Sequence, residues 1–345
     1  MLRTGSLHTV AYAVTATWIV ASDGGSEVKR ILVTGAAGFI GSHVAEMLLE
    51  RGDEVVGLDE LNDYYPVAYK RENLALLGRH PQFSFVEGDI CDRRLVADLF
   101  VTRRFTHLAH LAARAGVRPS ITDPFLYQRA NCDGTLTLLS ACVGAGLENV
   151  VIASSSSVYG NSRAIPFRED DSATDRPISP YAATKKATEV MAHTFHHLHG
   201  LAITVIRPFT VYGPRGRPDM APWLFVESAL SGRPIRKFGD GTTRRDYTYI
   251  GDFARGFVNA IDRPLGYEIV NLGNSATVSL NEALDVVREV TGRELVIEQA
   301  PPQPGDVEIT NADISKARRL LDYDPATSFR EGMARFCDWY RRSRL

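Results

Sequence analysis

Two side chains that can exchange a proton lie four residues apart in the stretch Ser179-Pro180-Tyr181-Ala182-Ala183-Thr184-Lys185. This stretch is predicted to start a helix, in which residues i and i+4 share one face. An ammonium near a phenol favours the phenolate, so Tyr181 could act as a general base near neutral pH with Lys185 beside it. The same spacing also occurs in surface pairs without a function, so the rest of the chain must decide.

A glycine-rich turn near the N-terminus supplies the first context. The β-branched run Lys29–Thr34 leads directly into Gly35-Ala36-Ala37-Gly38-Phe39-Ile40-Gly41, and residues 42–51 then have helical apolar spacing. In a strand, turn and helix of this kind, Gly35 permits the tight turn and Gly38 lets the backbone approach a pyrophosphate. Gly41 lets helix and strand pack closely. The pattern predicts a dinucleotide site.

Two aspartates follow the next two predicted strands. Residues 54–58 end at Asp59, where an acidic residue can accept hydrogen bonds from an adenosine ribose and repel a 2′-phosphate, which favours NAD over NADP. The alternative is an aspartate in a surface turn. Residues 83–90 form a third strand that leads into Asp89, a candidate partner of the adenine edge, with Ile90 packed on the ring.

The following segments place small and hydroxylated residues at strand ends. Residues 106–113 form a fourth strand ending in Ala112 and Ala113, which suits close passage of a dinucleotide backbone. Residues 124–142 form an amphipathic helix that carries Asn131. Residues 150–153 form an apolar, buried parallel strand that delivers residues 154–160 to its carboxyl end, where open α/β sheets bind ligands.

Composition excludes several classes of protein. The 345 residues, 44% hydrophobic and 23% charged, are typical of one large α/β unit or two lobes, and the net charge of -2 argues against nucleic-acid binding. The scattered Cys91, Cys132, Cys142 and Cys337 lack C-x-x-C spacing, which indicates free thiols in the cytoplasm. No apolar run is long enough to span a bilayer.

The first 28 residues are interpreted separately. Residues 7–22 are fairly apolar and follow Arg3, a weak signal-peptide feature, but the run is interrupted by polar residues and its cleavage pattern is poor. We expect a flexible extension ahead of the first strand.

The order of these motifs resembles the extended short-chain dehydrogenase/reductase family, and specifically its nucleotide-sugar epimerases. The resemblance covers residues 29–340. It implies an α/β fold, with a doubly wound parallel-sheet Rossmann domain and a smaller C-terminal α/β substrate lobe. The Rossmann domain would span residues 29–207 and a return at about 238–275, and the lobe residues 208–237 and 276–345.

The resemblance also implies roles for single residues. NAD would be held tightly, Tyr181 would be the base, and Lys185 would bind the nicotinamide ribose and lower the tyrosine pKa. The hydroxyl of Ser155 would bond to the reacting sugar hydroxyl. Cofactor contacts are expected from the residues named above and from Phe39, Ile40, Asn131 and Pro208.

The residues around the serine distinguish reactions within the family. The 4,6-dehydratases have a Thr-Asp-Glu segment here, and the UDP-glucuronate decarboxylases carry a glutamate, whereas this chain has Ser155-Ser156-Ser157. Without a carboxylic acid in the segment, neither reaction is expected. What remains is 4-epimerisation through a 4-keto intermediate.

A loop in the second half narrows the sugar. Gly216-Arg217-Pro218-Asp219-Met220 looks like the signature of the glucuronate 4-epimerases, as does the stretch 61–65. Arg217 could hold a C6 carboxylate bidentately and keep the β-keto acid intermediate from losing carbon dioxide. Alternatively it contacts the diphosphate or solvent. The other expected substrate contacts are Arg118, Ser155, Ser156, Ser157, Thr210, Arg245 and Asp306.

Two residues depart from this subgroup, since Arg114 replaces an expected glutamine and Pro119 an expected aromatic residue. The expected activity is epimerisation of UDP-glucuronate to UDP-galacturonate, with UDP-glucose or UDP-N-acetylglucosamine as alternative substrates. A non-catalytic NAD-binding sensor or scaffold is the alternative of another class. The resemblance further implies a homodimer joined by a four-helix bundle and no metal, so we interpret His193, His196, His197 and His199 as helix-surface residues.

Overall fold

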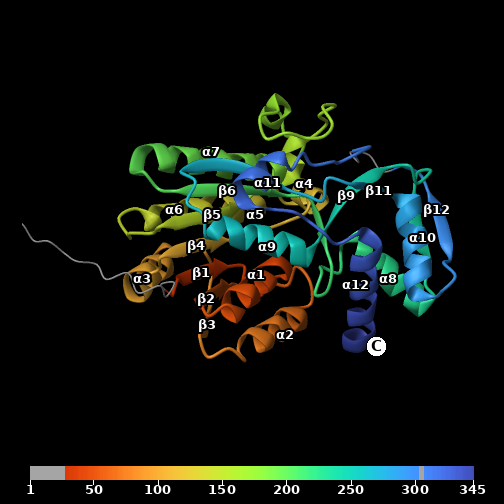
Figure 1. Cartoon of the computed structure of the whole chain (residues 1–345), viewed down its shortest axis with the longest axis horizontal. Coiled ribbons are helices and arrows are strands. Elements are labelled where there is room, and N and C mark those ends of the chain that lie inside the picture. The colour runs from red at the N-terminus through yellow and green to blue at the C-terminus, as the bar shows by residue number, and fades with distance from the viewer. Residues whose placement is uncertain (1–27, 303–306) are drawn as a thin grey trace, which may run out of the picture.

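A seven-stranded parallel sheet forms the centre of the computed structural model, which describes residues 28–302 and 307–345 (Figure 1). Its strands are β1 (Arg30–Thr34), β2 (Glu54–Asp59), β3 (Phe83–Glu87), β4 (His107–His110), β5 (Asn149–Ala153), β6 (Ile203–Pro208) and β10 (Tyr267–Leu272). Their spatial order is β10-β6-β5-β4-β1-β2-β3, with every neighbouring pair parallel. The strand order reverses between β1 and β4, which leaves a crevice at the carboxyl ends of the strands. The predicted doubly wound sheet is confirmed.

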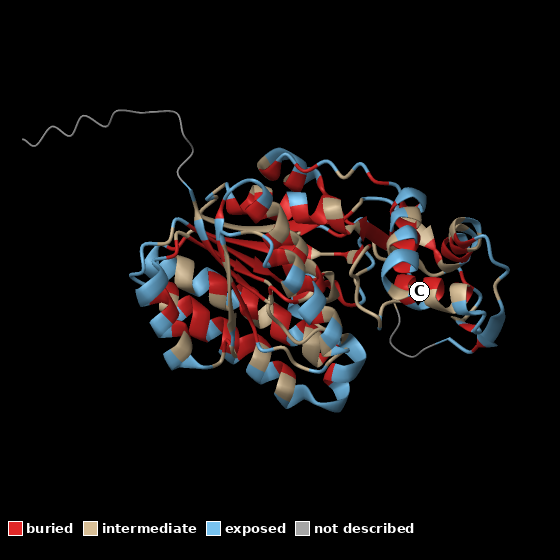
Figure 2. Ribbon diagram, turned by 90° about the horizontal axis from the view of Figure 1, so that it is seen from below, coloured by how far each residue is buried: buried red, intermediate tan, exposed pale blue. Residues whose placement is uncertain are grey.

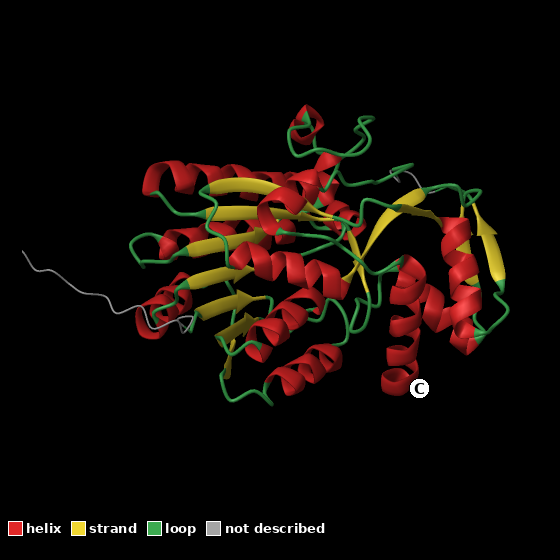
Figure 3. Ribbon diagram, in the orientation of Figure 1, coloured by secondary structure: helices red, strands yellow, loops and turns green. Residues whose placement is uncertain are grey.

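Helices cover both faces of this sheet, as Figure 3 shows. One face carries α1 (Phe39–Glu50), α2 (Val67–Leu77), α9 (Ile250–Ile261) and α11 (Ser315–Leu321), and the other α3 (Arg93–Arg103), α6 (Gly134–Cys142) and α7 (Pro180–His199). Side chains of a strand alternate between faces, so Ile31 and Val33 join one apolar cluster while Leu32 joins the other. Both faces of the strands are therefore buried, as the apolar runs in the sequence require.

The segment predicted as one helix over 124–142 has three parts. A short α5 (Pro124–Tyr127) and α6 are joined by a π-helical turn, η1 (Gln128–Asp133), which contains Asn131. The remaining short elements near the carboxyl ends of the strands are α4 (Val117–Thr122) and the 3₁₀ turns η2 (Ser156–Tyr159) and η3 (Ser172–Asp175). The extra residue of a π turn redirects the side chains that follow it, and helical periodicity in the sequence does not reveal it.

A second core lies beside the sheet, seen at the right of Figure 2 as a separate group of buried residues. It is built by α8 (Ala221–Ser231), α10 (Leu280–Thr291) and α12 (Phe329–Arg344) around Trp223 and Phe336. A parallel pair, β8 (Ile235–Phe238) and β12 (Ile297–Ala300), flanks it. The small sheet of β7 (Thr210–Tyr212), β9 (Arg244–Tyr249) and β11 (Thr277–Ser279) lies between this core and the large sheet.

The chain returns to the large sheet through α9 and β10, and α11 also packs there, against α9 and β10. The exact division into two lobes stays a prediction. The predicted N-terminal extension lies outside the described residues, apart from Val28. No helix among the described residues is long and apolar enough to cross a membrane.

Candidate active site

A cavity of about 460 Å³ opens at the carboxyl ends of the parallel strands. It collects most of the residues predicted from the sequence to bind a cofactor or a substrate. Those lining it are Gly35, Gly38, Phe39, Ile40, Gly41, Asp59, Asp89, Ile90, Ala112, Ala113, Ser155, Ser156, Ser157, Tyr181, Lys185, Pro208, Thr210 and Arg217. Residues as far apart in the sequence as Gly35 and Arg217 therefore meet in one site.

The glycine turn leaves no room for side chains. Gly35 has φ +71, and a Cβ there would lie 2.8 Å from the Ala112 nitrogen, while a Cβ on Gly41 would lie 2.0 Å from the Gly35 carbonyl oxygen. Gly38 precedes α1 at the N-cap position, and no side chain caps the helix. The first amides of α1 and its dipole are thus available at the cavity wall, which suits a pyrophosphate.

Asp59 ends β2 and is buried beneath this turn. Its Oδ2 accepts a hydrogen bond from the Ala37 amide at 3.2 Å, and its Oδ1 accepts one from the Leu61 amide at 2.9 Å. The ammonium of Lys70, also buried, lies 3.6 Å from Oδ1. Burial lowers the pKa of Lys70 although Asp59 opposes the shift. Asp59 is therefore held in place and partly charge-balanced at the point where a ribose would bind.

Asp89 lies at the neighbouring strand end. Its Oδ1 accepts from the Cys91 amide at 2.8 Å, and its Oδ2 pairs with Arg129 at 2.5 Å. Burial opposes ionisation, but these hydrogen bonds prevail and lower the pKa of Asp89. An ionised carboxylate only accepts hydrogen bonds, so Asp89 suits a contact with the amino group of an adenine.

Tyr181 occupies the first turn of α7. Ser179 caps the helix by accepting from the Ala182 amide at 3.1 Å, and the Tyr181 amide donates to the Ser120 hydroxyl at 3.1 Å. Burial raises the pKa of the Tyr181 phenol, whereas a hydrogen bond with Ser155 and the positive charge of Arg217 act in the opposite direction. The phenol thus lies among the groups that a general base in this cavity needs.

Lys185 lies one turn further along α7 and is almost fully buried. Its ammonium donates to the carbonyl oxygen of Ala153 at 2.7 Å, and burial lowers its pKa to about 8. The two groups that offset the burial of the Tyr181 phenol are Ser155 and Arg217, and Lys185 is not one of them. The predicted effect of Lys185 on the tyrosine therefore stays a prediction.

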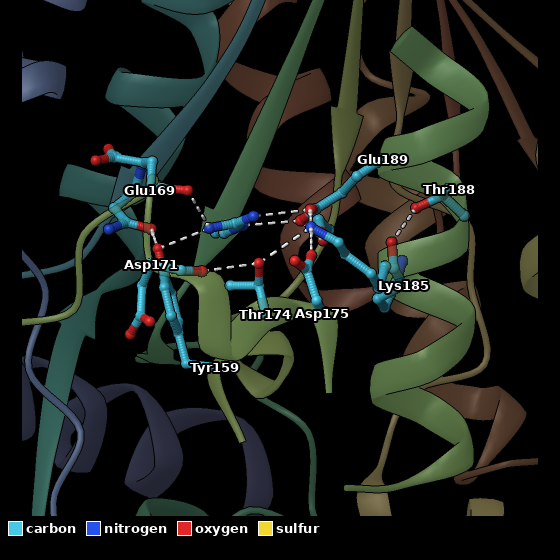
Figure 4. Close-up of polar contacts among 12 residues, drawn as sticks. Tyr159, Glu169, Asp171, Thr174, Asp175, Lys185, Thr188 and Glu189 are labelled. Carbon is cyan, nitrogen blue, oxygen red and sulfur yellow. Dashed lines mark hydrogen bonds and ion pairs between the residues drawn. The ribbon is translucent and has the colours of Figure 1, made fainter. Parts of the chain in front are cut away.

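A buried ion pair anchors α7 behind these residues. Both oxygens of Glu189 accept from Arg207 on β6, each at 2.8 Å, and Oε1 also accepts from the Ser154 hydroxyl at 2.7 Å. Arg207 continues the network to the Tyr159 hydroxyl at 2.9 Å and to the Glu169 carbonyl. Figure 4 follows these contacts from Glu189 on α7 to Tyr159 and Glu169. They fix α7 relative to the strand ends.

Ser155 lies where β5 gives way to η2, and its hydroxyl accepts from the Ser157 amide at 3.1 Å. It is buried, faces the cavity and bonds to Tyr181. Ser155 and Tyr181 therefore face the same cavity, and the predicted role of the serine hydroxyl stays a prediction.

Arg217 reaches the cavity from the loop after β7. Its guanidinium pairs with Asp219 and contacts the hydroxyl of Tyr64, which comes from the loop after β2. The Tyr64 ring lies under the guanidinium, with its centroid 5.2 Å from Cζ. The Arg217 guanidinium and the Tyr181 phenol thus line the same cavity.

Three predicted contacts lie outside the lining of this cavity. The Asn131 amide group binds the backbone of Arg114 and the Thr184 hydroxyl, so it connects the loop after β4 to α7. Arg118 lines an adjoining hollow with Arg114 and Pro119, and Arg245 lies on β9, where it donates to the Arg244 carbonyl. Asp306 lies outside the described residues. The ligand contacts predicted for these four residues remain untested.

The sequence reasoning missed several residues of the site. Lys70, Glu60 and Arg129 line the cavity, and Glu60 lies 3.4 Å from Arg114. None of them belongs to a motif, and only Glu60 carried a signal, because it directly follows β2. Tyr64 lies in the stretch noted after Asp59, but its contact with Arg217 depends on the fold. Among the described residues, no group of three His, Cys, Asp or Glu side chains could hold a metal ion.

Comparisons with known proteins agree on one family. The model of the NAD dependent epimerase/dehydratase family matches residues 31–273. The UDP-glucuronate 4-epimerase of Thermodesulfobacterium geofontis (strain OPF15) is 44% identical over 313 residues, which cover 90% of this chain and 96% of that protein. UDP-glucuronate 4-epimerase 4 of Arabidopsis thaliana is 43% identical over 330 residues, covering 90% and 75%.

Solved structures are similar over nearly the whole chain. The UDP-glucuronic acid 4-epimerase of Bacillus cereus, in complex with UDP-glucuronic acid and NAD, superposes with a TM-score of 0.84 at 36% identity, covering 91% of this chain and 99% of that chain. MoeE5 in complex with UDP-glucose and NAD superposes with a TM-score of 0.80 at 38% identity, with the same coverage. MoeE5 has also been solved with UDP-glucuronic acid and NAD.

Proposed function

The chain belongs to the NAD dependent epimerase/dehydratase family, and we propose that it is an isomerase that interconverts UDP-glucuronate and UDP-galacturonate. The observation that carries this proposal is the position of Arg217, whose charge acts on Tyr181 inside the cavity. Tyr181 as the general base and Arg217 as the partner of the carboxylate would then face the same sugar. The 4-epimerase relatives that share 43–44% of their residues with the chain support the same reaction.

The cavity fits NAD on the chain's own geometry. The tight glycine turn at Gly35 and Gly41 and the uncapped start of α1 suit the pyrophosphate, Asp59 would accept from the adenosine ribose, and Asp89 would meet the adenine. When bound, NAD supplies a group that takes a hydride from C4 of the sugar and returns it.

Proton transfer falls to Tyr181. In our proposal its phenolate takes the proton of the C4 hydroxyl as the carbonyl forms and gives it back as the carbonyl is reduced. Ser155 bonds to the same phenol and would orient the sugar hydroxyl. Lys185, fixed on the Ala153 carbonyl, would hold the nicotinamide ribose. Since each turnover restores every group, the reaction is redox-neutral.

Arg217 would hold the C6 carboxylate. Oxidation at C4 makes the sugar a β-keto acid, which loses carbon dioxide when its C–CO₂ bond aligns with the carbonyl π system. A guanidinium that fixes the carboxylate out of this alignment would protect the product, and it offers two parallel donors for the purpose. Thr210, Ser156 and Ser157 line the same cavity and would complete the sugar contacts.

Epimerisation of UDP-glucose is the second candidate, because MoeE5 binds both UDP-glucose and UDP-glucuronic acid. The purified chain should be incubated with each nucleotide sugar, and the epimers and released carbon dioxide quantified. We expect UDP-galacturonate with little carbon dioxide. Activity on UDP-glucose alone would refute the carboxylate role of Arg217, and no turnover on either would favour a non-catalytic NAD-binding protein.

We further propose a homodimer located in the cytoplasm. Large apolar side chains are exposed on three neighbouring helices, namely Phe125 (82% exposed) on α5, Leu136 (39%) on α6 and Val190 (57%) on α7. Packing α5–α6 and α7 against the same helices of a second copy would bury them in a four-helix bundle. Light scattering should give twice the chain mass for the wild type, and Val190→Asp should halve that mass. A monomeric wild type would contradict the proposed dimer.

The proposed location in the cytoplasm rests on the free cysteines, which suit a reducing compartment.

A further inference from the structure

We propose that Asp219 is a positioning residue that sets the sugar specificity of the site, because it orients Arg217 and partly neutralises its charge. By doing so it would limit how strongly the site prefers a sugar with a C6 carboxylate over a neutral hexose. The inference rests on the proposed function, in which Arg217 meets the sugar at C6.

Asp219 occupies one complete edge of the Arg217 guanidinium. Arg217 Nε donates to Oδ1 at 3.0 Å and Nη2 donates to Oδ2 at 2.5 Å, the bidentate geometry of a strong arginine–carboxylate pair. Among the described residues, nothing accepts a hydrogen bond from Nη1. The carboxylate of a substrate would therefore meet a guanidinium that already has one anion bound along its other edge.

Tyr64 completes the cluster. Its hydroxyl donates to Asp219 Oδ2 at 3.3 Å and lies 3.4 Å from Arg217 Nη2, and its ring supports the guanidinium face. Tyr64 and Arg217 line the cavity, whereas Asp219 does not. Asp219 therefore acts on a ligand through Arg217 and not by direct contact.

Burial shows from which side each partner approaches. The Arg217 side chain is 19% exposed and the Asp219 side chain 42%, so Asp219 approaches from solvent and Arg217 presents its remaining donors to the cavity. A mostly buried cation without a partner is costly. With Asp219 in place, a neutral sugar leaves no unpaired charge, whereas a uronate must bind beside a second carboxylate.

The size of the effect follows from the charges. Two carboxylates on the two adjacent edges of one guanidinium lie roughly 6 Å apart. Because Asp219 is partly exposed, their repulsion lies between the value for a protein surface and that for water. Removing the charge of Asp219 should therefore shift the ratio of kcat/KM for UDP-glucuronate to that for UDP-glucose about tenfold toward UDP-glucuronate.

The test is Asp219→Asn, which keeps an oxygen for Arg217 Nε and removes the charge. Initial rates with UDP-glucuronate and UDP-glucose give the ratio of kcat/KM for each variant. The rates are measured at low salt and again in about 0.5 M NaCl, where the Debye length falls to about 4 Å. We expect the tenfold shift to lie mainly in KM and to shrink in high salt. Asp219→Glu keeps the charge and should retain the wild-type ratio within about threefold.

Asp63→Asn is the matched control, since Asp63 is an exposed carboxylate in the Tyr64 loop without a contact to Arg217. It should leave the ratio unchanged. An unchanged ratio in Asp219→Asn, a shift toward UDP-glucose, or the same shift in Asp219→Glu would overturn the proposal for Asp219. A wild-type chain inactive on UDP-glucuronate would instead overturn the proposed function. Because the ratio compares two substrates on one protein, a partly unfolded variant does not disturb it.

Discussion

Glu189→Gln should destabilise the chain more than any exposed charge substitution, because it breaks the buried pair with Arg207. Both side chains are 1% exposed, and Glu189 accepts three hydrogen bonds, two from Arg207 and one from Ser154. Glutamine removes the charge and turns one acceptor into a donor that faces the guanidinium. Leaving Arg207 without its counter-ion should cost about 3–5 kcal/mol of unfolding free energy.

Urea unfolding followed by circular dichroism measures this loss. For a chain of this size it corresponds to a decrease of roughly 4–7 °C in Tm. Asp170→Asn is the control, since the pair of Arg168 and Asp170 is mostly exposed and should contribute about 1 kcal/mol at most. A double variant with Arg207→Met removes both charges and should lose less than Glu189→Gln alone, since the Tyr159 hydroxyl keeps its bond to Asn271 at 2.7 Å.

Two results would refute this reasoning. If Glu189→Gln loses no more stability than Asp170→Asn, the pair is not the anchor of α7 that its burial suggests. If the double variant loses as much as the sum of the single changes, the cost does not come from an unpaired charge.

Three further predictions concern the chemistry. Tyr181→Phe should lower kcat by about 10²–10⁴-fold while bound NAD, measured after denaturation of the purified protein, stays equal to that of the wild type; retained turnover would remove Tyr181 from the mechanism. Ser155→Ala removes a hydrogen bond that lowers the tyrosine pKa, so that pKa should rise and the acid limb of the kcat profile against pH should move to higher pH; an unmoved limb would contradict this role. Asp59→Asn should raise the affinity for NADP relative to NAD, measured by titration of both cofactors, and an unchanged ratio would show that Lys70, 3.6 Å away, already neutralises Asp59.

The sequence predicts the sheet and most of the cavity for a definite physical reason. Parallel strands end at one edge of a sheet, so residues that directly follow strands converge there without any knowledge of long-range packing. Asp59, Asp89, Ala113 and Ser155 all follow apolar runs, and all four line the cavity. Gly41 could be assigned because strand, turn and helix are consecutive in the chain.

Residues that depend on packing between distant segments could not be assigned. Lys70 reaches Asp59 from α2, and Arg207 reaches Glu189 from β6, and neither pair has a sequence pattern. The π turn of η1 places the Asn131 amide between the segment after β4 and α7, an arrangement that its helical pattern does not reveal. A pattern locates the element on which a residue lies, whereas the hydrogen-bond partners of its side chain depend on the neighbouring elements.

The position of Tyr181 follows from a register that no single motif contains. Tyr181, Lys185 and Glu189 lie four residues apart on one face of α7 and bind three consecutive residues at the end of β5. Tyr181 bonds to Ser155, Lys185 to the Ala153 carbonyl and Glu189 to the Ser154 hydroxyl. Because Glu189 is also tied to Arg207 on β6, a shift of α7 along β5 would break all of these contacts at once. The base is therefore positioned by a helix that is fixed to two strands. Of this arrangement, only the Tyr-x-x-x-Lys spacing can be recognised in the sequence.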